Sequence, residues 1–339
     1  MSITIKDIAE KAGVSITTVS KIINKKDDDI SDKTRNKVLK VIDEYNYIPS
    51  ALATGLVTKK TNTIGLLLPD ISNAFFAELA RGVEDGANCE GYNVILCNTD
   101  DDPEKENQYL SVLKSKHVDG IVFLSTALSN HSAIRELSRK GFPVIVLDRA
   151  FDDEDILAVF IDNVMGGYLA TKHLTEFGHK AIGCITGPLK PKLAIQRLEG
   201  YKKALKEAHI DFNEELIYEG NFKTRSGELG AKKLLKAGAT AIFASNDMMA
   251  YGVYKAVHDE GLSIPYDISV VGFDDIFLSE ILSPPLTSVK QPTYEMGIMS
   301  AAMLIKKIKN EELKQLRVEY KPTLSVRKSV AYPADKVET

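Results

Sequence analysis

From residue 61 onward the chain alternates short apolar runs with longer amphipathic stretches, and this alternation limits the possible folds more than any other feature. Runs that are apolar throughout are typical of strands in parallel sheets that helices cover on both faces. Nine such runs are more than one compact sheet usually holds, which favours two sheets. The runs are 64–68, 93–97, 120–124, 144–147, 181–185, 215–218, 241–244, 269–273 and 287–289.

The rhythm breaks within residues 148–160, where the acidic residues Asp152, Asp153, Glu154 and Asp155 follow one another. We interpret the acidic run as a solvated loop and place the crossing between the two sheets in this segment. The expected fold class is therefore α/β, with a core of two doubly wound parallel-sheet lobes.

The first fifty residues predict three short helices. Thr4 can cap a helix over residues 5–12, Gly13 can end it, and Ser15 can cap a second helix that runs to about residue 24. Ser31 can cap a third. Two helices joined by a short turn with glycine form a helix-turn-helix, although any small three-helix bundle shares this pattern. The apolar positions of the three helices are Ile8, Ala9, Ala12, Val14, Val19, Ile22, Ile23, Val38, Ile42 and Tyr45.

The net charge also differs between the first sixty residues and the remainder of the chain. The formal net charge is -4, but residues 1–60 hold eleven Lys and Arg against eight Asp and Glu, a net of +3, which leaves -7 for the remainder. A basic N-terminal segment is typical of a domain that binds a polyanion, and the acidic remainder indicates a domain with a different function.

Neither a secretory signal nor a membrane span is visible, so we expect a cytoplasmic protein without membrane contact. Cys89, Cys97 and Cys184 have no CxxC spacing and lie among apolar neighbours, which predicts buried reduced thiols. The histidines are dispersed, so the sequence supports no metal site.

Residues that follow the apolar runs are the candidate ligand contacts, because ligands of open α/β sheets bind beyond the carboxyl ends of the strands. Here they include phenylalanines, carboxylates, arginines and amides, which together suit a small, uncharged, polyhydroxylated ligand. Asp and Asn at such positions are often only turn or capping residues, and we expect this simpler role for Asp70, Asp100 and Asp162.

Enzyme motifs are missing from the sequence. There is no GxGxxG, no GxxxxGK[ST] and no GxSxG, so the sequence supports no cofactor and no nucleotide or serine-esterase chemistry. Asp274 and Asp275 could suggest a glycosidase, but adjacent residues should point in different directions and no second acid with a defined role accompanies them. We therefore expect a protein that is not an enzyme.

The string IKDIAEKAGVSITTVSKIIN, followed by YNYIPSALATGL, resembles the lactose-repressor (LacI/GalR) family of bacterial transcription regulators, and the resemblance continues to about residue 330. It implies that the second helix enters the major groove of DNA, where Ile16, Thr17 and Lys21 contact bases. It places further DNA contacts at Thr4, Ser15, Thr18 and Asn24, the last three nearer phosphates.

By the same resemblance, residues 49–61 contain a hinge helix that folds on the operator. Ser50 and Ala51 would contact DNA, and Leu56 would wedge into the minor groove. This chain departs from the family pattern at Thr54, Gly55 and Val57. Because Gly weakens a helix by about 1 kcal/mol relative to Ala, we expect looser coupling between hinge and DNA.

For the body, the resemblance implies a core like that of the periplasmic binding proteins, with ten sugar contacts, and it is strongest toward members that respond to ribose. Ala74 stands where a proline is common. Pro191, Lys192 and Leu193 replace the polar residues with which purine-responsive members read a base. The implied effector contacts are Asn73, Phe75, Phe76, Asp148, Arg149, Arg197, Phe222, Asn246, Asp274 and Gln291.

These features together predict a homodimeric repressor that binds a palindromic operator under the control of a small sugar, with D-ribose expected. The effector of such a regulator could also be another sugar, a sugar phosphate or a co-repressor. A sugar-binding transport receptor or a sugar-modifying enzyme is a more distant alternative for the protein as a whole. The expected domains are 1–48 (DNA-binding), 49–61 (hinge and linker), 62–160 with 291–322 (first lobe), 161–290 with 323–330 (second lobe) and 331–339 (polar tail).

Overall fold

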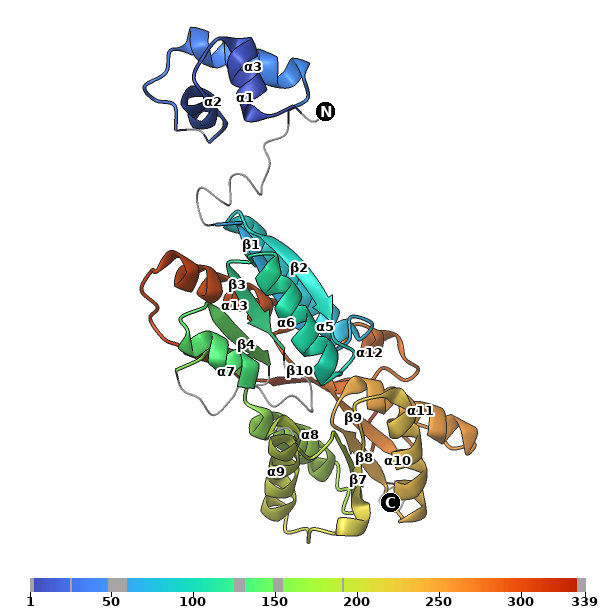
Figure 1. The fold of residues 1–339 in the computed structure, drawn as a ribbon. Helices are drawn as coiled ribbons and strands as arrows, with labels where there is room; N and C mark the ends of the chain where they lie inside the picture. The colour runs from blue at the N-terminus through green and yellow to red at the C-terminus, as the bar shows by residue number, and fades with distance from the viewer. Residues whose placement is uncertain are drawn as a thin grey trace. The chain divides into compact units, whose positions relative to one another are not determined.

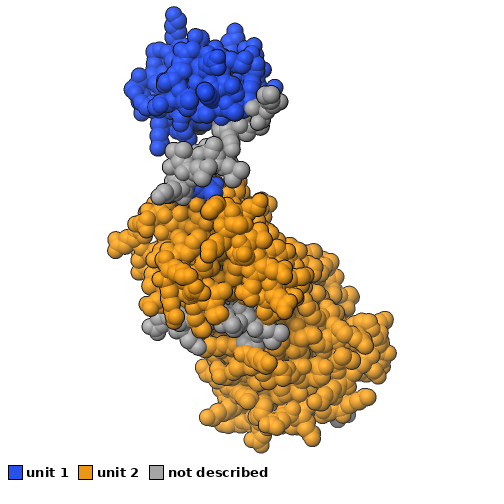
Figure 2. Space-filling view, viewed as in Figure 1, with its two compact units in different colours: residues 1–61 blue, residues 62–339 orange. Residues whose placement is uncertain are grey.

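A computed structural model of the chain describes residues 3–24, 26–47, 60–124, 132–148, 155–190 and 192–333. The protein divides into two compact units, residues 1–61 and residues 62–339, which Figure 2 colours separately. The described part of the first unit is helical, and the second unit contains two sheets with their covering helices (Figure 1).

The first unit contains α1 (Ile5–Ala12), α2 (Ile16–Ile23) and α3 (Asp32–Glu44). The predicted caps are confirmed: Thr4, Ser15 and Ser31 each accept a hydrogen bond from a backbone N–H of the first turn, and Gly13 ends α1 in the left-handed region at φ 62°. Tyr45 was wrongly assigned to the apolar face, because it is exposed at the end of α3 under Lys11. The small core consists of Ile8, Ala9, Ala12, Val19, Ile22 and Val38.

The second unit is built on two six-stranded sheets, and the predicted α/β class is confirmed. In spatial order, the first sheet is β11 (Arg317–Tyr320), β5 (Leu157–Ile161), β4 (Val144–Asp148), β3 (Gly120–Phe123), β1 (Thr63–Leu68) and β2 (Asn93–Asn98). The second is β12 (Thr323–Ser325), β10 (Thr287–Lys290), β9 (Ser269–Asp274), β8 (Ala241–Ala244), β6 (Ile182–Thr186) and β7 (Ile217–Glu219). Neighbouring strands are parallel except for β12, which is antiparallel to β10.

Helices cover both faces of each sheet, which explains the fully apolar strands. The first sheet is covered by α5 (Ala74–Cys89) and α13 (Thr293–Lys309) on one face and by α6 (Pro103–Ser115) and α7 (Ser132–Arg139) on the other. The second is covered by α8 (Asn163–Glu176) and α9 (Lys192–Glu207) and, on its other face, by α10 (Thr224–Lys236) and α11 (Asp247–Asp259). Two short elements, η1 (Glu214–Leu216) and α12 (Leu278–Ile281), complete the unit.

Three strands, β5, β11 and β12, were not predicted from the sequence. The expected position of the crossing between the two sheets was also wrong. Residues 148–160 do not carry the chain to the second sheet, because β5 returns it to the first, and the crossing follows Ile161. Two later crossings follow β10 and β11. The strands β11 and β12 are short and only half-buried, so they lack the continuous apolar run that identifies a central strand.

Cysteine burial is also only partly as expected. Cys97 and Cys184 are buried thiols, whereas Cys89 is exposed at the end of α5.

Within the described ranges, no helix is long and apolar enough to cross a membrane.

Close contact between α8 and α9 depends on glycine. A Cβ atom at Gly167 would overlap the backbone carbonyl of Arg197 on α9, and one at Gly200 would overlap the carbonyl of Val164 on α8. Glycine therefore lets the two helices approach until their backbones touch, and this contact sets the position of Arg197.

We predict that Gly167→Val lowers the free energy of unfolding by about 3 kcal/mol, because the added side chain forces the two helices apart. Urea unfolding followed by circular dichroism measures this change. Glu199→Val, which places the same side chain on the exposed face of α9, is the matched control. Equal midpoints for the two variants would contradict the close-packing argument.

Candidate functional site

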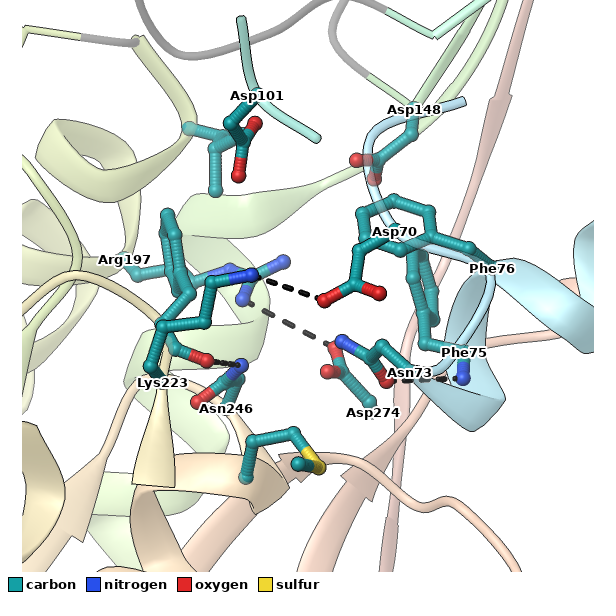
Figure 3. Close-up of a pocket in the computed structure, with 13 residues that line it drawn as sticks. Asp70, Asn73, Phe75, Phe76, Asp101, Asp148, Arg197, Lys223, Asn246 and Asp274 are labelled. Atoms are coloured by element: carbon teal, nitrogen blue, oxygen red, sulfur yellow. Dashed lines mark hydrogen bonds and ion pairs between the residues drawn. The ribbon is translucent and has the colours of Figure 1, made fainter. Parts of the chain in front are cut away.

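One pocket collects residues from both sheets of the second unit (Figure 3). The empty space within it is about 570 Å³, which includes space open to solvent. The lining residues are Asp70, Asn73, Phe75, Phe76, Asp101, Asp148, Leu193, Arg197, Phe222, Lys223, Asn246, Met248 and Asp274.

Two asparagines of the pocket are also helix caps. The side chain of Asn73 accepts a hydrogen bond from the Phe75 N–H at the start of α5. Asn246 accepts from the Met249 N–H at the start of α11 and donates to the Phe222 carbonyl at 3.0 Å. The capping role and the pocket role coexist, because the cap uses one oxygen and holds the amide at the pocket edge.

Backbone conformation turns several strand ends toward the pocket. Asp148 at the end of β4, Phe222 after β7 and Asp274 at the end of β9 all have positive φ, at 69°, 63° and 109°. Non-glycine residues adopt such conformations at a cost of order 1–3 kcal/mol, and they persist where the surrounding structure enforces them, often at functional sites.

Arg197 is a buried residue of the pocket, with 3% of its surface exposed. Its guanidinium donates to the Asn163 side chain at 2.8 Å and to the Ser245 carbonyl at 2.5 Å, and it stacks on the Phe273 ring at 3.6 Å from the centroid. Its distance to the Asp274 carboxylate is 3.9 Å. These contacts hold the guanidinium as a rigid hydrogen-bond donor at the pocket.

Asp274 lines the pocket beside Arg197, and Gln291 contacts Asp274 from behind. Burial raises the pKa of Asp274 well above its ordinary value, although the charge of Arg197 acts in the opposite direction. Gln291 donates to Asp274 at 2.8 Å and keeps a buried side-chain oxygen that accepts no hydrogen bond within the described part of the chain. Asp274 therefore offers its carboxyl group to a polar ligand, and Gln291 holds that group in place.

The neighbouring acids serve other purposes. Asp275 points away from the pocket to Arg327 at 2.5 Å and Ser325 at 2.7 Å, so the two adjacent acids do diverge. Asp247 is fully buried and accepts from Ser279 and Ser288; burial raises its pKa to about 7. Neither acid faces Asp274 across a space that a glycosidic bond could occupy.

The structure brings eight of the ten predicted effector contacts to this pocket: Asn73, Phe75, Phe76, Asp148, Arg197, Phe222, Asn246 and Asp274. Gln291 lies behind Asp274, and Arg149 falls outside the described residues. Phe75 and Phe76 meet edge to face with ring centroids 5.2 Å apart. Contact with an effector remains a prediction for all ten.

Five lining residues are not among the predicted effector contacts: Asp70, Asp101, Leu193, Lys223 and Met248. Of these, Leu193 was named from the sequence only as a residue that stands where purine-responsive members read a base. Asp70 is a turn residue, as expected, because it accepts from Ser72, but its other oxygen also meets Lys223 at 2.9 Å. Burial alone would raise the pKa of Asp70, but the hydrogen bonds from Ser72 and Lys223 outweigh it and hold the value low. This ion pair joins loops that follow β1 of one sheet and β7 of the other beside the pocket (Figure 3).

In the first unit, α2 carries four of the ten predicted DNA contacts, and two of them, Ile16 and Thr17, are exposed. Ile16 has 47% of its surface exposed, although it is apolar, and Thr17 is exposed beside it. An exposed isoleucine at the start of a helix is available for a thymine methyl group.

Other predicted DNA contacts already have partners within the first unit. Thr4 forms a capping box with Asp7, Ser15 bonds to Thr18, and Asn24 donates to the Ser20 carbonyl. Lys21 lies 2.5 Å from Asp29, and this hydrogen bond lowers the pKa of Asp29. The hinge contacts Ser50, Ala51 and Leu56, and the departures Thr54, Gly55 and Val57, lie outside the described residues.

Family comparisons cover almost the whole chain. Residues 4–50 match "Bacterial regulatory proteins, lacI family", and residues 61–324 match "Periplasmic binding proteins and sugar binding domain of LacI family". The first match covers most of the helical first unit, and the second covers most of the two-sheet second unit.

Similar proteins share this full length. The chain is 42% identical to the HTH-type transcriptional regulator DegA of Bacillus subtilis, over 98% of this chain and 99% of that protein. It is 40% identical to the ribose operon repressor of Escherichia coli K12, over 96% and 99%, and 40% identical to the HTH-type transcriptional repressor PurR of Vibrio vulnificus, over 96% and 98%.

Two solved structures complete the comparison. The lac repressor dimer bound to operator and the anti-inducer ONPF matches with a TM-score of 0.87 and 28% identity, over 98% of this chain and 100% of that one. A LacI family regulator from Enterococcus faecium with bound ribose matches with a TM-score of 0.73 and 35% identity, over 80% and 99%. The fold and site define a DNA-binding regulator with a ligand-binding core. The chain belongs to the LacI family of bacterial transcription regulators, and its relatives are regulators and not enzymes.

We predict that Arg197→Ala lowers the free energy of unfolding by about 3 kcal/mol, because it leaves the polar groups around a buried guanidinium without their partner. Urea unfolding measures the loss. The double variant Arg197→Met with Asp274→Asn removes both charges and keeps more of the volume, so it should recover part of the stability. No recovery would show that packing on Phe273, and not the polar network, explains the loss.

Proposed function

We propose that the protein is a homodimeric repressor that binds a palindromic operator and releases it when D-ribose occupies the pocket between the two sheets. The observation that carries the ligand proposal is the convergence of Phe75, Phe76, Arg197 and Asp274 with the asparagines in one pocket. Phenylalanine rings can stack on the C–H faces of a sugar, while arginine, amide and carboxylate groups bond its hydroxyls.

Two relatives support a ribose-type effector: the ribose-bound regulator from Enterococcus faecium and the ribose operon repressor of Escherichia coli. The relatives also include a purine repressor. Against a purine here, Leu193 lines the pocket near the start of α9 and offers only an apolar surface. A base with several hydrogen-bonding atoms would leave them unsatisfied against leucine.

Exposed apolar side chains support the homodimer. The edge strand β2 exposes Ile95 and Leu96, and the α12 region exposes Phe277 (68%) and Ile281 (73%). Apolar groups of this size in exposed positions mark interaction surfaces when they gather. A dimer presents two heads to two half-sites, so its symmetry predicts a palindromic operator.

Control by the sugar follows from linkage. Ribose changes operator affinity only if the DNA-binding and non-binding arrangements of the core bind it with different affinities. The chain passes between the two sheets three times, after β5, β10 and β11. These crossings and the Asp70–Lys223 pair are the elements through which a ligand bound between the sheets would change their relative orientation.

Isothermal titration of the full chain tests the effector. We expect D-ribose to bind, adenine and hypoxanthine not to bind, and operator affinity to fall when ribose is present. A selection from randomised palindromic duplexes supplies the operator. Purine binding without ribose binding would overturn the ligand proposal and leave the regulator class intact.

We predict that Lys21→Ala weakens operator binding by about tenfold or more and relaxes the base preference at one position of each half-site, as expected for a guanine contact. Fluorescence anisotropy with single-base operator variants measures both effects. Lys40→Ala, which removes the same charge from an exposed position of α3, should leave base preference unchanged. An unaltered preference in Lys21→Ala would remove this residue from the major groove.

A further inference from the structure

Asp101 lines the pocket but is not among the sugar contacts that the family resemblance implied. It lies in the loop between β2 and α6, and Figure 3 shows its carboxylate on the same side of the pocket as Asp148, across from Asn246 and Asp274. The residue therefore comes from a strand end that contributes no other predicted contact.

The loop that carries Asp101 is firmly anchored on both sides. Asn98 accepts from the Ile71 N–H at 2.7 Å and donates to Asp100 at 2.5 Å. The Asp100 carboxylate also meets Lys105 at 2.5 Å, and Asp102 caps α6 by accepting from the Glu104 N–H. The two acids that flank Asp101 thus serve the loop itself.

Asp101 instead turns toward the pocket. It follows Asp100 in the left-handed region, with φ values of 56° and 58° for the two residues, a conformation that aspartate and asparagine tolerate better than most residues. Its Oδ1 atom is buried and accepts no hydrogen bond from any described residue. A buried acceptor without a donor is unfavourable, and a ligand hydroxyl would satisfy it.

Charge at the pocket points to the class of ligand. Arg197 already faces Asp274, and Lys223 already pairs with Asp70. Asp101 adds a carboxylate, which accepts hydrogen bonds from hydroxyl groups but repels an anion. An uncharged sugar suits this wall of the pocket, and a phosphorylated sugar does not.

We propose that Asp101 is a direct effector contact that accepts a hydrogen bond from a sugar hydroxyl and makes the pocket select the free sugar over its phosphate. This inference rests on the proposed sugar-binding function. It adds a specificity-determining residue to that site and excludes one class of effector.

Titration of the full chain and of Asp101→Asn with D-ribose and with ribose 5-phosphate tests the proposal. Asparagine keeps the left-handed backbone and nearly the same shape, so thermal melting should be unchanged. Loss of a charged acceptor should weaken ribose binding by about tenfold, and the preference for ribose over its phosphate should shrink by at least that factor. Glu104→Gln removes the same charge from an exposed residue near the start of α6 and should keep the preference of the unaltered chain.

Each other outcome overturns a distinct statement. If the unaltered chain binds ribose and Asp101→Asn binds it equally well with the same preference, Asp101 is only a loop residue. An equal loss of preference in Glu104→Gln would assign selectivity to general charge and contradict a direct contact. A preference of the unaltered chain for the phosphate overturns the selection proposal alone, and absence of binding by both sugars overturns the ribose proposal together with it.

Discussion

The path of the chain between its two sheets is the constraint on which the rest of the core depends. Three crossings, after β5, β10 and β11, join the sheets, so neither lobe is a continuous piece of sequence. Strand ends from both sheets contribute to the same pocket, as expected for ligand sites beyond the carboxyl ends of parallel strands. A ligand bound there contacts both lobes at once, which is the physical basis for control of one lobe's position by a small molecule.

Buried polar groups hold the side chains of the pocket in place. Arg197 is held by Asn163, by the Ser245 carbonyl and by stacking on a phenylalanine ring, and the glycine contact between α8 and α9 sets where its backbone lies. Such preorganisation spares the ligand the entropy of ordering its own site. We therefore expect stability and effector recognition to depend on the same residues, so that substitutions there affect both.

The two units carry net charges of opposite sign, which the net charge of the whole chain does not show. The head is basic, yet Lys21 pairs with Asp29 on the surface that we propose for DNA. To contact a base, Lys21 must break its ion pair with Asp29 and bind the DNA instead. We propose that the acidic body limits indiscriminate attraction to DNA, so that binding depends on the two heads of the proposed dimer.

Periodicity, caps and motif strings in the sequence by themselves determined the three head helices, nine of the strands, the α/β class and the family, because these signals are local. They also identified Arg197 and the asparagines as pocket residues, since strand ends and family motifs mark them. Only the tertiary structure revealed β11 and β12, which are short and half-buried, and the return of β5 to the first sheet. It alone brought Lys223 to Asp70 and turned Asp101 inward, because contacts between residues far apart in sequence, and the direction of a side chain in a loop, depend on packing that no local pattern encodes.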